Sequence, residues 1–352
     1  MELIHGGDWA GFESEYGTRP LDFSANISPL GLPDGVRAAA SAALSDAARY
    51  PDPLCRRLRA ALSEYHGVPE ENIVCGNGAA ELIWRLCRAL RPKKAALFAP
   101  TFAEYARALE AEDCEIAFIP LRAADGFRLT AALASRVPQD TELLFLCNPN
   151  NPTGRLAERD AVLHLLKLCR ERDMTLIIDE CFLDFCREPA AHSLVGALAQ
   201  TPRLVILKAF TKTHAMAGLR LGYALCGSAA LAEKLQQSAE PWAVSSIAQA
   251  AGVAAVREEA YITRLRALVG AERARLIPAL EGLRLRVIPG EANFLLFRAE
   301  DGALSEKLRR RGILIRPCGN FAGLDANWYR AAVRTQAEND QLLRALGEVL
   351  HG

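Results

Sequence analysis

Short apolar runs alternate with segments of helical period through the middle of this 352-residue chain. Runs of this length, bounded by turn residues, are typical of strands buried on both faces. Strands are predicted at Ala95–Ala99, Glu115–Ile119, Leu143–Cys147, Thr175–Ile178, Leu204–Leu207 and Gly222–Cys226. Helices are predicted at Leu54–His66, Ala79–Leu90 and Ala161–Arg172, where apolar side chains fall on one face. This order of elements predicts an α/β fold with a mainly parallel sheet covered on both faces.

The pattern changes after about residue 228, and a second, smaller α+β unit is expected there. Helices predominate through Leu280, and later elements are predicted as strands at Leu283–Ile288, Ala292–Phe297 and Gly312–Ile315 and a helix at Glu338–Leu350. The first 30 residues show little periodicity and are expected to form an ordered arm without helix. We therefore expect an arm with part of the small domain at residues 1–40, a large domain at 41–235 and a small domain at 236–352.

Charge and cysteine usage exclude several classes of protein. Lys plus Arg and Asp plus Glu both number 42, so the basic excess typical of nucleic-acid-binding proteins is absent. No apolar run reaches the roughly 18 residues of a membrane span, and the N-terminus has no secretory signal pattern. The ten cysteines are scattered and do not cluster with histidines, which predicts reduced thiols and no metal site. We expect a cytoplasmic protein with no nucleic-acid or membrane partner.

Three polar features follow predicted strands, where ligands bind in α/β sheets. Asn148–Gly154 (NPNNPTG) is a loop stiffened by proline and glycine, in which Asn151 offers a side-chain amide. Asp179 closes the strand TLII. Lys212 follows the strand LVIL, and Arg220 after it offers a planar fork suited to phosphate. A lysine that acts as an amine needs the lowered pKa that burial beside another cation provides. Each feature alone would be an ordinary turn or surface charge, but together they predict one site.

This ordered set, NPNNPTG, IIDE and TK…GLRLGY, resembles the fold-type-I pyridoxal-phosphate enzymes of the aspartate aminotransferase superfamily, over nearly the whole chain. The resemblance implies a mainly parallel large domain, a smaller α+β domain and pyridoxal 5'-phosphate as cofactor. It implies that Lys212 binds the cofactor covalently, that Asp179 pairs with its pyridinium nitrogen and that Asn151 bonds its phenolic oxygen. The remaining cofactor contacts that it implies are a phosphate cradle and a stacking ring at Gly78, Ala79, Ala80, Thr211, Arg220 and Phe102.

Two positions depart from the usual aminotransferase pattern. Phe182 lies where many members have a tyrosine that bonds the phenolic oxygen, and Ala209 lies where a serine or threonine often holds the cofactor phosphate. Both argue against a generic aminotransferase.

The arm narrows the resemblance to one branch of the superfamily. His5-Gly6-Gly7 and the segment DFSANISPLG resemble the signature of threonine-phosphate decarboxylases, as does RPCGNF except that Pro317 replaces an acid. The resemblance to this branch implies a homodimer with shared active sites, in which Tyr50 would reach a phosphate across the subunit interface. The implied substrate contacts are His5, Gly6, Asn26, Tyr50, Asn151 and Arg316, with Arg330 on the carboxylate.

The expected reaction is therefore decarboxylation of L-threonine O-3-phosphate to (R)-1-aminopropan-2-yl phosphate in cobalamin biosynthesis. L-Serine phosphate stays open as a substrate, because one methyl group is worth only about 1–3 kcal/mol in a pocket. A histidinol-phosphate or other amino-acid aminotransferase is the main alternative and would use the same Lys212. A non-enzymatic regulator would carry a DNA-binding segment ahead of the enzyme-like part, and the first 30 residues are neither basic nor patterned as helix.

Overall fold

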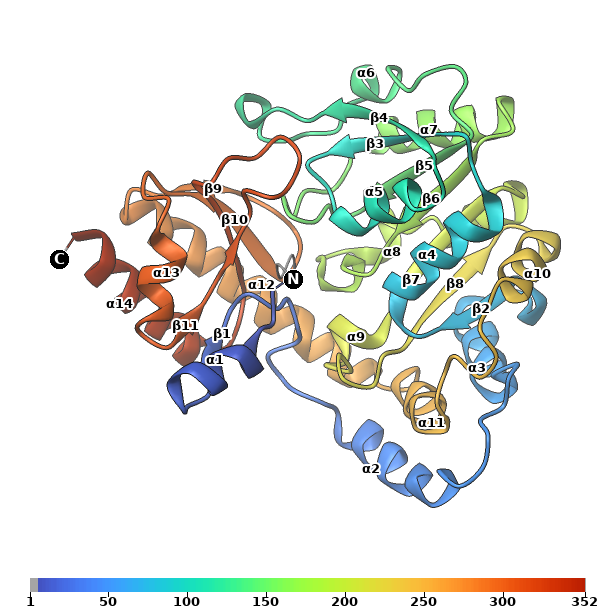
Figure 1. Ribbon diagram of the computed structural model, residues 1–352, viewed down its shortest axis with the longest axis horizontal. Helices are drawn as coiled ribbons and strands as arrows, with labels where there is room; N and C mark the ends of the chain where they lie inside the picture. Colours follow the sequence, from blue (N-terminus) through green and yellow to red (C-terminus); the bar gives the residue numbers. More distant parts are fainter. Residues whose placement is uncertain (1–5, 352) are drawn as a thin grey trace.

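The computed structural model describes residues 6–351 and contains sheets of seven, four and two strands (Figure 1). The seven-stranded sheet has the order β2-β8-β7-β6-β5-β3-β4. Its strands are β2 Ile73–Gly76, β3 Lys94–Ala99, β4 Glu115–Pro120, β5 Leu143–Cys147, β6 Thr175–Asp179, β7 Leu204–Ala209 and β8 Gly222–Cys226. All of the strands predicted for this sheet are present, and β2 is an additional strand too short to stand out as an apolar run.

The sheet is parallel from β4 through β7, as predicted, and β8 is the antiparallel exception. Ala209 at the end of β7 pairs with Gly222 at the start of β8. The chain between them therefore forms a return loop on the same edge of the sheet instead of a crossover. Lys212 and Arg220 both lie in this loop.

Helices cover both faces of the large sheet. Alternate residues of β5 enter different cores: Leu144 and Leu146 belong to one, and Leu143 and Phe145 to the other. All ten cysteines are buried and free. The helices in this part of the chain are α3 Arg56–His66, α4 Gly78–Leu90, α5 Ala103–Glu110, α6 Ala131–Ala134, α7 Arg159–Glu171, α8 Pro189–His192, α9 Phe210–Thr213, α10 Ala229–Gln237 and α11 Ser246–Ala255.

The C-terminal part forms a second sheet with the order β12-β13-β10-β9, antiparallel throughout. Its strands are β9 Arg286–Ile288, β10 Phe294–Arg298, β12 Arg316–Pro317 and β13 Trp328–Ala332. The helices α12 Glu259–Gly282, α13 Leu304–Arg309 and α14 Gln336–His351 pack with it around a third core. In Figure 1 this unit lies beside the large sheet, and the long α12 runs behind the small sheet towards the large unit. The sequence pattern predicts neither β12, which has two residues, nor the five-residue β13.

The arm joins both units. Its strand β1 Leu21–Asp22 pairs in parallel with β11 Ile313–Leu314, and its helix α2 Asp34–Ala42 packs on α11. The expectation that the arm has no helix is wrong, because α1 Trp9–Tyr16 forms there. Asp8 caps its start by accepting from the Gly11 amide, but only Phe12 is buried, so little periodicity is visible in the sequence. The domain boundaries at residues 40 and 235 stay a proposal.

Within the described part of the chain, no helix is both long and apolar enough to cross a membrane.

Candidate active site

A cavity of about 440 Å³ lies where the ends of β5, β6 and β7 face the four-stranded sheet and the arm. It is lined by most of the residues that the sequence singles out: Gly6, Asn26, Ala79, Ala80, Phe102, Asn151, Asp179, Thr211, Lys212, Arg220, Arg316 and Arg330. Gly78 adjoins it, and His5 lies outside the described residues. Tyr50 does not line the cavity; it is 79% exposed and stacks on Trp242 with ring centroids 4.4 Å apart.

Asp179 is the last residue of β6 and is buried at the floor of the cavity. Its Oδ2 accepts a hydrogen bond from the Tyr105 hydroxyl at 2.7 Å, and its Oδ1 accepts from the Cys181 amide at 2.9 Å. No lysine or arginine among residues 6–351 forms an ion pair with it. A buried carboxylate needs polar partners, so Asp179 has acceptor capacity suited to a cationic N–H group.

Lys212 is in the short helix α9, and its amine faces this cavity. Burial, reinforced by the positive charges of Arg330 and Arg220, lowers the pKa of Lys212 to about 8. Roughly a tenth of the amine is therefore neutral at pH 7, far more than for an ordinary lysine, and the neutral form is the one that attacks a carbonyl carbon.

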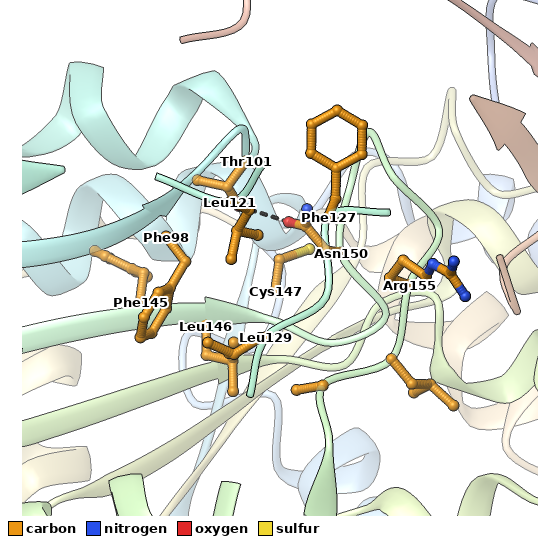
Figure 2. Close-up of a pocket in the computed structure, with 12 residues that line it drawn as sticks. Phe98, Thr101, Leu121, Phe127, Leu129, Phe145, Leu146, Cys147, Asn150 and Arg155 are labelled. Atoms are coloured by element: carbon orange, nitrogen blue, oxygen red, sulfur yellow. Dashed lines mark hydrogen bonds between the residues drawn. The ribbon is translucent and has the colours of Figure 1, made fainter. Parts of the chain in front are cut away.

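The loop that carries Asn151 is braced by its neighbour Asn150. The Asn150 side chain accepts from Thr101 Oγ1 at 2.9 Å and donates to the Pro100 carbonyl at 2.9 Å. Figure 2 shows the Thr101 contact beside a small apolar cavity of about 20 Å³, which has room for about one water molecule. Because Thr101 directly precedes Phe102, these bonds fix Asn151 relative to the aromatic ring on the cavity wall.

An anion-binding cradle lies at one end of the cavity. The first turn of α4 begins at Gly78 with φ +83°, and a Cβ atom there would lie 2.7 Å from Nη2 of Arg220. A Cβ atom at Gly222 would lie 2.6 Å from the Ala79 amide nitrogen. Glycine at 78 thus leaves room for the Arg220 guanidinium, and glycine at 222 lets the start of β8 approach the backbone of the first turn of α4. Backbone amides and a guanidinium together suit a phosphate group.

Two buried arginines occupy the opposite wall. Arg316 and Arg330 are directly paired residues of β12 and β13. Arg330 donates to the Asn151 side-chain oxygen and to the Ser24 carbonyl (3.1 Å). The Asn26 amide oxygen, in the orientation that satisfies both of its polar groups, accepts from Nε of Arg330 at 3.2 Å. Arg316 donates to the Asn320 side chain at 2.9 Å.

The charge of Arg330 has no carboxylate partner in the described part of the chain. Burial lowers the pKa of Arg330 to about 10, and the neighbouring Arg316 contributes to this shift. A buried guanidinium that is held only by neutral oxygens is suited to receive an anion.

The residues present fit pyridoxal phosphate at each of its functional groups. Lys212 matches the aldehyde, Asp179 the ring nitrogen and Asn151 the phenolic oxygen, while the cradle at α4 matches the phosphate. The departures noted in the sequence are real features of the site. Phe182 is buried on the wall and packs edge-to-face on Phe294 with centroids 5.1 Å apart, so no hydroxyl is offered there.

Sequence reasoning missed four polar residues of this site: Ser24, Glu104 and Arg107 line the cavity, and Tyr105 bonds Asp179. The clearest signals concern Tyr105 and Ser24. Tyr105 lies three residues after Phe102, so both fall on one side of α5. Ser24 lies inside the DFSAN segment, beside Asn26. For both residues the sequence signal is a position close to a recognised motif residue. Their hydrogen-bond partners are distant in the sequence and are brought near only by the fold.

Comparison with known proteins gives consistent matches over the length of the chain. The family model described as Aminotransferase class I and II matches residues 18–346. A threonine-phosphate decarboxylase of Salmonella typhimurium is 40% identical, over 99% of this chain and 97% of its own length. An adenosylcobalamin biosynthesis bifunctional protein of Leptospira interrogans is 31% identical over 99% of this chain and 41% of its own. The crystal structure of histidinol-phosphate aminotransferase from Clostridium acetobutylicum has a TM-score of 0.87 and 32% identity, covering 94% of this chain and 98% of that one.

Proposed function

Because the chain belongs to the class I and II aminotransferase family, we propose that it is a pyridoxal-phosphate enzyme that decarboxylates L-threonine O-3-phosphate to (R)-1-aminopropan-2-yl phosphate for adenosylcobalamin biosynthesis. The observation that carries the proposal is the pair of buried arginines, Arg316 and Arg330, side by side on one wall. A substrate with both a carboxylate and a phosphate needs two cationic partners, and this wall supplies them.

Lys212, Asp179, Asn151 and Arg220 would hold the cofactor, with Phe102 against its ring. When bound, pyridoxal phosphate supplies an electron sink for the pair of electrons left at Cα as carbon dioxide departs. Asp179 favours this chemistry because its buried carboxylate stabilises a positive charge on the ring nitrogen.

The arginines orient the substrate. Arg330 binds the carboxylate, and Arg316 binds the phosphate together with Asn26, Gly6 and His5 of the arm. Arginine binding alone stabilises a carboxylate that must leave as neutral carbon dioxide, and this interaction weakens in the transition state. The useful contribution is orientation, since two fixed anion contacts set the direction of the Cα–carboxylate bond.

Lys212 moves the proton. With a pKa near 8 its Nζ both holds and releases a proton close to neutral pH. It is the proton donor to the substrate Cα after carbon dioxide has left.

We also propose a cytoplasmic homodimer with shared sites. Tyr50 is a largely exposed phenol that stacks on Trp242, which is itself 46% exposed. Exposed aromatic side chains that lie together favour a protein interface. In the dimer, Tyr50 of the partner subunit would reach the phosphate end of the cavity.

The decisive experiment supplies L-threonine phosphate with no keto acid and measures carbon dioxide and the amino-alcohol phosphate. Both products are expected in equal amounts. If no carbon dioxide appears and histidinol phosphate instead converts the bound cofactor to its amine form, the enzyme is an aminotransferase. L-Serine phosphate, run in parallel, measures how far the pocket distinguishes one methyl group.

A further inference from the structure

The arm is attached to the strand that carries Arg330 by three successive backbone carbonyls. The Ser24 carbonyl accepts from the Arg330 side chain at 3.1 Å, and the Phe23 carbonyl accepts from the Ala332 amide at 2.8 Å. The Asp22 carbonyl accepts from the Arg334 side chain at 3.2 Å. Every second residue of the strand and its continuation therefore donates to one residue of the arm, which fixes the register between them.

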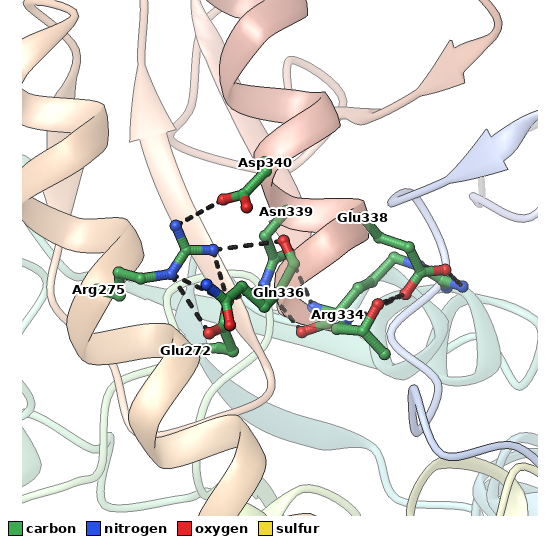
Figure 3. A network of polar contacts seen from close by, with 8 residues as sticks. Glu272, Arg275, Arg334, Gln336, Glu338, Asn339 and Asp340 are labelled. Carbon is green, nitrogen blue, oxygen red and sulfur yellow. Dashed lines mark hydrogen bonds and ion pairs between the residues drawn. The ribbon is translucent and has the colours of Figure 1, made fainter.

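The last of these donors is itself held rigidly, as Figure 3 shows. Arg334 pairs with Glu338 at 2.5 Å, and its backbone amide donates to the Asn339 side chain at 3.1 Å. Asn339 in turn donates to Glu272 on α12 at 2.7 Å. The arm is thus bound to a segment whose side chains are hydrogen-bonded to one another and to α12. Its position beside Arg330 is therefore fixed by Arg334 as well as by Arg330 itself.

Ser24 connects this part of the arm to the turn at Gly6 and Gly7. Its hydroxyl donates to Oδ1 of Asp22 at 2.6 Å and accepts from the Gly7 amide at 2.8 Å. A carboxylate can only accept, so Asp22 fixes the direction of the Ser24 hydroxyl hydrogen. The Ser24 oxygen then presents its lone pairs to Gly7, and the pair of bonds has one direction, from Gly7 to Ser24 to Asp22.

Close backbone contact completes the connection. A Cβ atom at Gly6 would clash with the Ser24 carbonyl, and Gly7 has φ +94°. Gly6 lines the cavity beside Ser24 and Asn26. The turn therefore approaches the site only because its residues are glycines and because Ser24 holds their backbone.

We propose that Ser24 is a positioning residue that holds the Gly6–Gly7 turn against the cavity and so sets affinity for the phosphate group of the substrate. The inference rests on the proposed function. It adds that the turn is held by the serine hydroxyl, and that the same residue contacts Arg330 through its carbonyl. Ser24 therefore contacts both groups that the proposed function assigns to the substrate anions, the glycine turn and Arg330.

The test compares Ser24→Ala with Ser28→Ala. Both serines are 5% exposed and lie on the same arm segment, but the Ser28 hydroxyl bonds Tyr261 at 2.6 Å. Ser24→Ala is expected to raise KM for L-threonine phosphate about tenfold, with a smaller fall in kcat and nearly unchanged cofactor content. Ser28→Ala should change KM less than about twofold. Hydrogen exchange of the Gly7 amide, measured on the cofactor-free protein, should accelerate in Ser24→Ala only.

Equal changes of KM in the two variants would overturn the proposal, as would an unchanged exchange rate at Gly7. Loss of cofactor from Ser24→Ala without a change in KM would also contradict it. A Ser24→Ala protein with a much lower Tm is still judged by the exchange measurement below its transition. Failure of the proposed function is distinct, because the unsubstituted enzyme would then release no carbon dioxide from L-threonine phosphate.

Discussion

The Tyr105 hydroxyl donates a 2.7 Å hydrogen bond to Oδ2 of Asp179, and its ring stacks on Phe145 of β5 with centroids 4.7 Å apart. Tyr105 thus joins α5, which also begins beside Phe102, to the carboxylate at the floor of the cavity. The start of α5 therefore supplies both the Phe102 ring on the cavity wall and the hydroxyl that bonds Asp179.

Tyr105→Phe removes a hydrogen bond to a charged group, worth about 1.5–3 kcal/mol. Because this bond stabilises the ionised carboxylate, kcat should fall about tenfold and the cofactor should dissociate faster. Stopped assays and dialysis followed by absorbance measure the two effects. Tyr329→Phe, which loses a 2.8 Å bond to the Asp301 carbonyl away from the site, is the matched control and should retain full cofactor binding.

Lys212 makes the stability of the cofactor-free protein depend on pH. Its pKa falls from 10.5 in the unfolded chain to about 8 in the folded one. Between these values the unfolded chain binds more protons, so stability should rise with pH from about 8 to 10.5. Lys212→Met removes this pH-dependent contribution to stability. The variant should therefore be more stable than the cofactor-free parent at pH 7, by a margin that shrinks across that window. Urea unfolding at several pH values measures the margin, and a constant difference would refute the assignment.

The roles of Arg330 and Arg316 should be distinguishable by comparing substrates with and without a phosphate group. Arg330→Gln leaves a substrate carboxylate without its charged partner, which costs about 2–5 kcal/mol, so kcat/KM should fall at least about thirtyfold with any amino-acid substrate. Arg316→Gln should show a loss of this size with L-threonine phosphate and little loss with L-threonine. Equal losses on the two substrates for Arg316→Gln would remove Arg316 from the phosphate site.

Mixed dimers test the shared site. Lys212→Ala and Tyr50→Ala are each expected to be inactive alone. In an equimolar mixture half of the dimers are mixed, and each mixed dimer has one intact site, so about a quarter of the activity should return. Activity that stays at zero after subunit exchange, or a fully active monomer in sedimentation, would contradict the proposal.

The buried ion pair behind the site should be important for stability. Lys208 Nζ lies 3.2 Å from Glu180, and both side chains are buried. Lys208→Met leaves that buried carboxylate without its cationic partner, with only Ser193 and the Leu194 amide donating to it, and should lower the free energy of unfolding by about 3–5 kcal/mol. Lys307→Met breaks an exposed pair with Asp301 and should cost at most about 1 kcal/mol. Denaturant melts of the two variants should differ accordingly.

The sequence predicts the large sheet well because its strands are buried on both faces. Runs such as LLFLC and TLIID need no partner information to be recognised, and polar residues at their ends converge on one edge of a parallel sheet. Asn151, Asp179 and Lys212 can therefore be grouped from the order of residues along the chain. The family resemblance adds the arginines and the arm.

What the sequence could not give depends on pairing in space. Strand β12 has only two residues, and it is defined by the register that places Arg316 opposite Arg330 of β13. The reversed direction of β8 follows from the pairing of Ala209 with Gly222. The role of Ser24 depends on Gly7 and Arg330, which are distant in sequence, and no local propensity encodes such contacts.

The direct pairing of Arg316 with Arg330 also means that the protein should respond to the anions in its buffer. Like charges on directly opposed residues of adjacent strands repel each other, so any small anion that enters between them stabilises the sheet. Sulfate or inorganic phosphate in a buffer is therefore expected to raise the melting temperature and to compete with the substrate that we propose for these arginines. The buffer anions that raise the melting temperature most are therefore expected to lower the activity most.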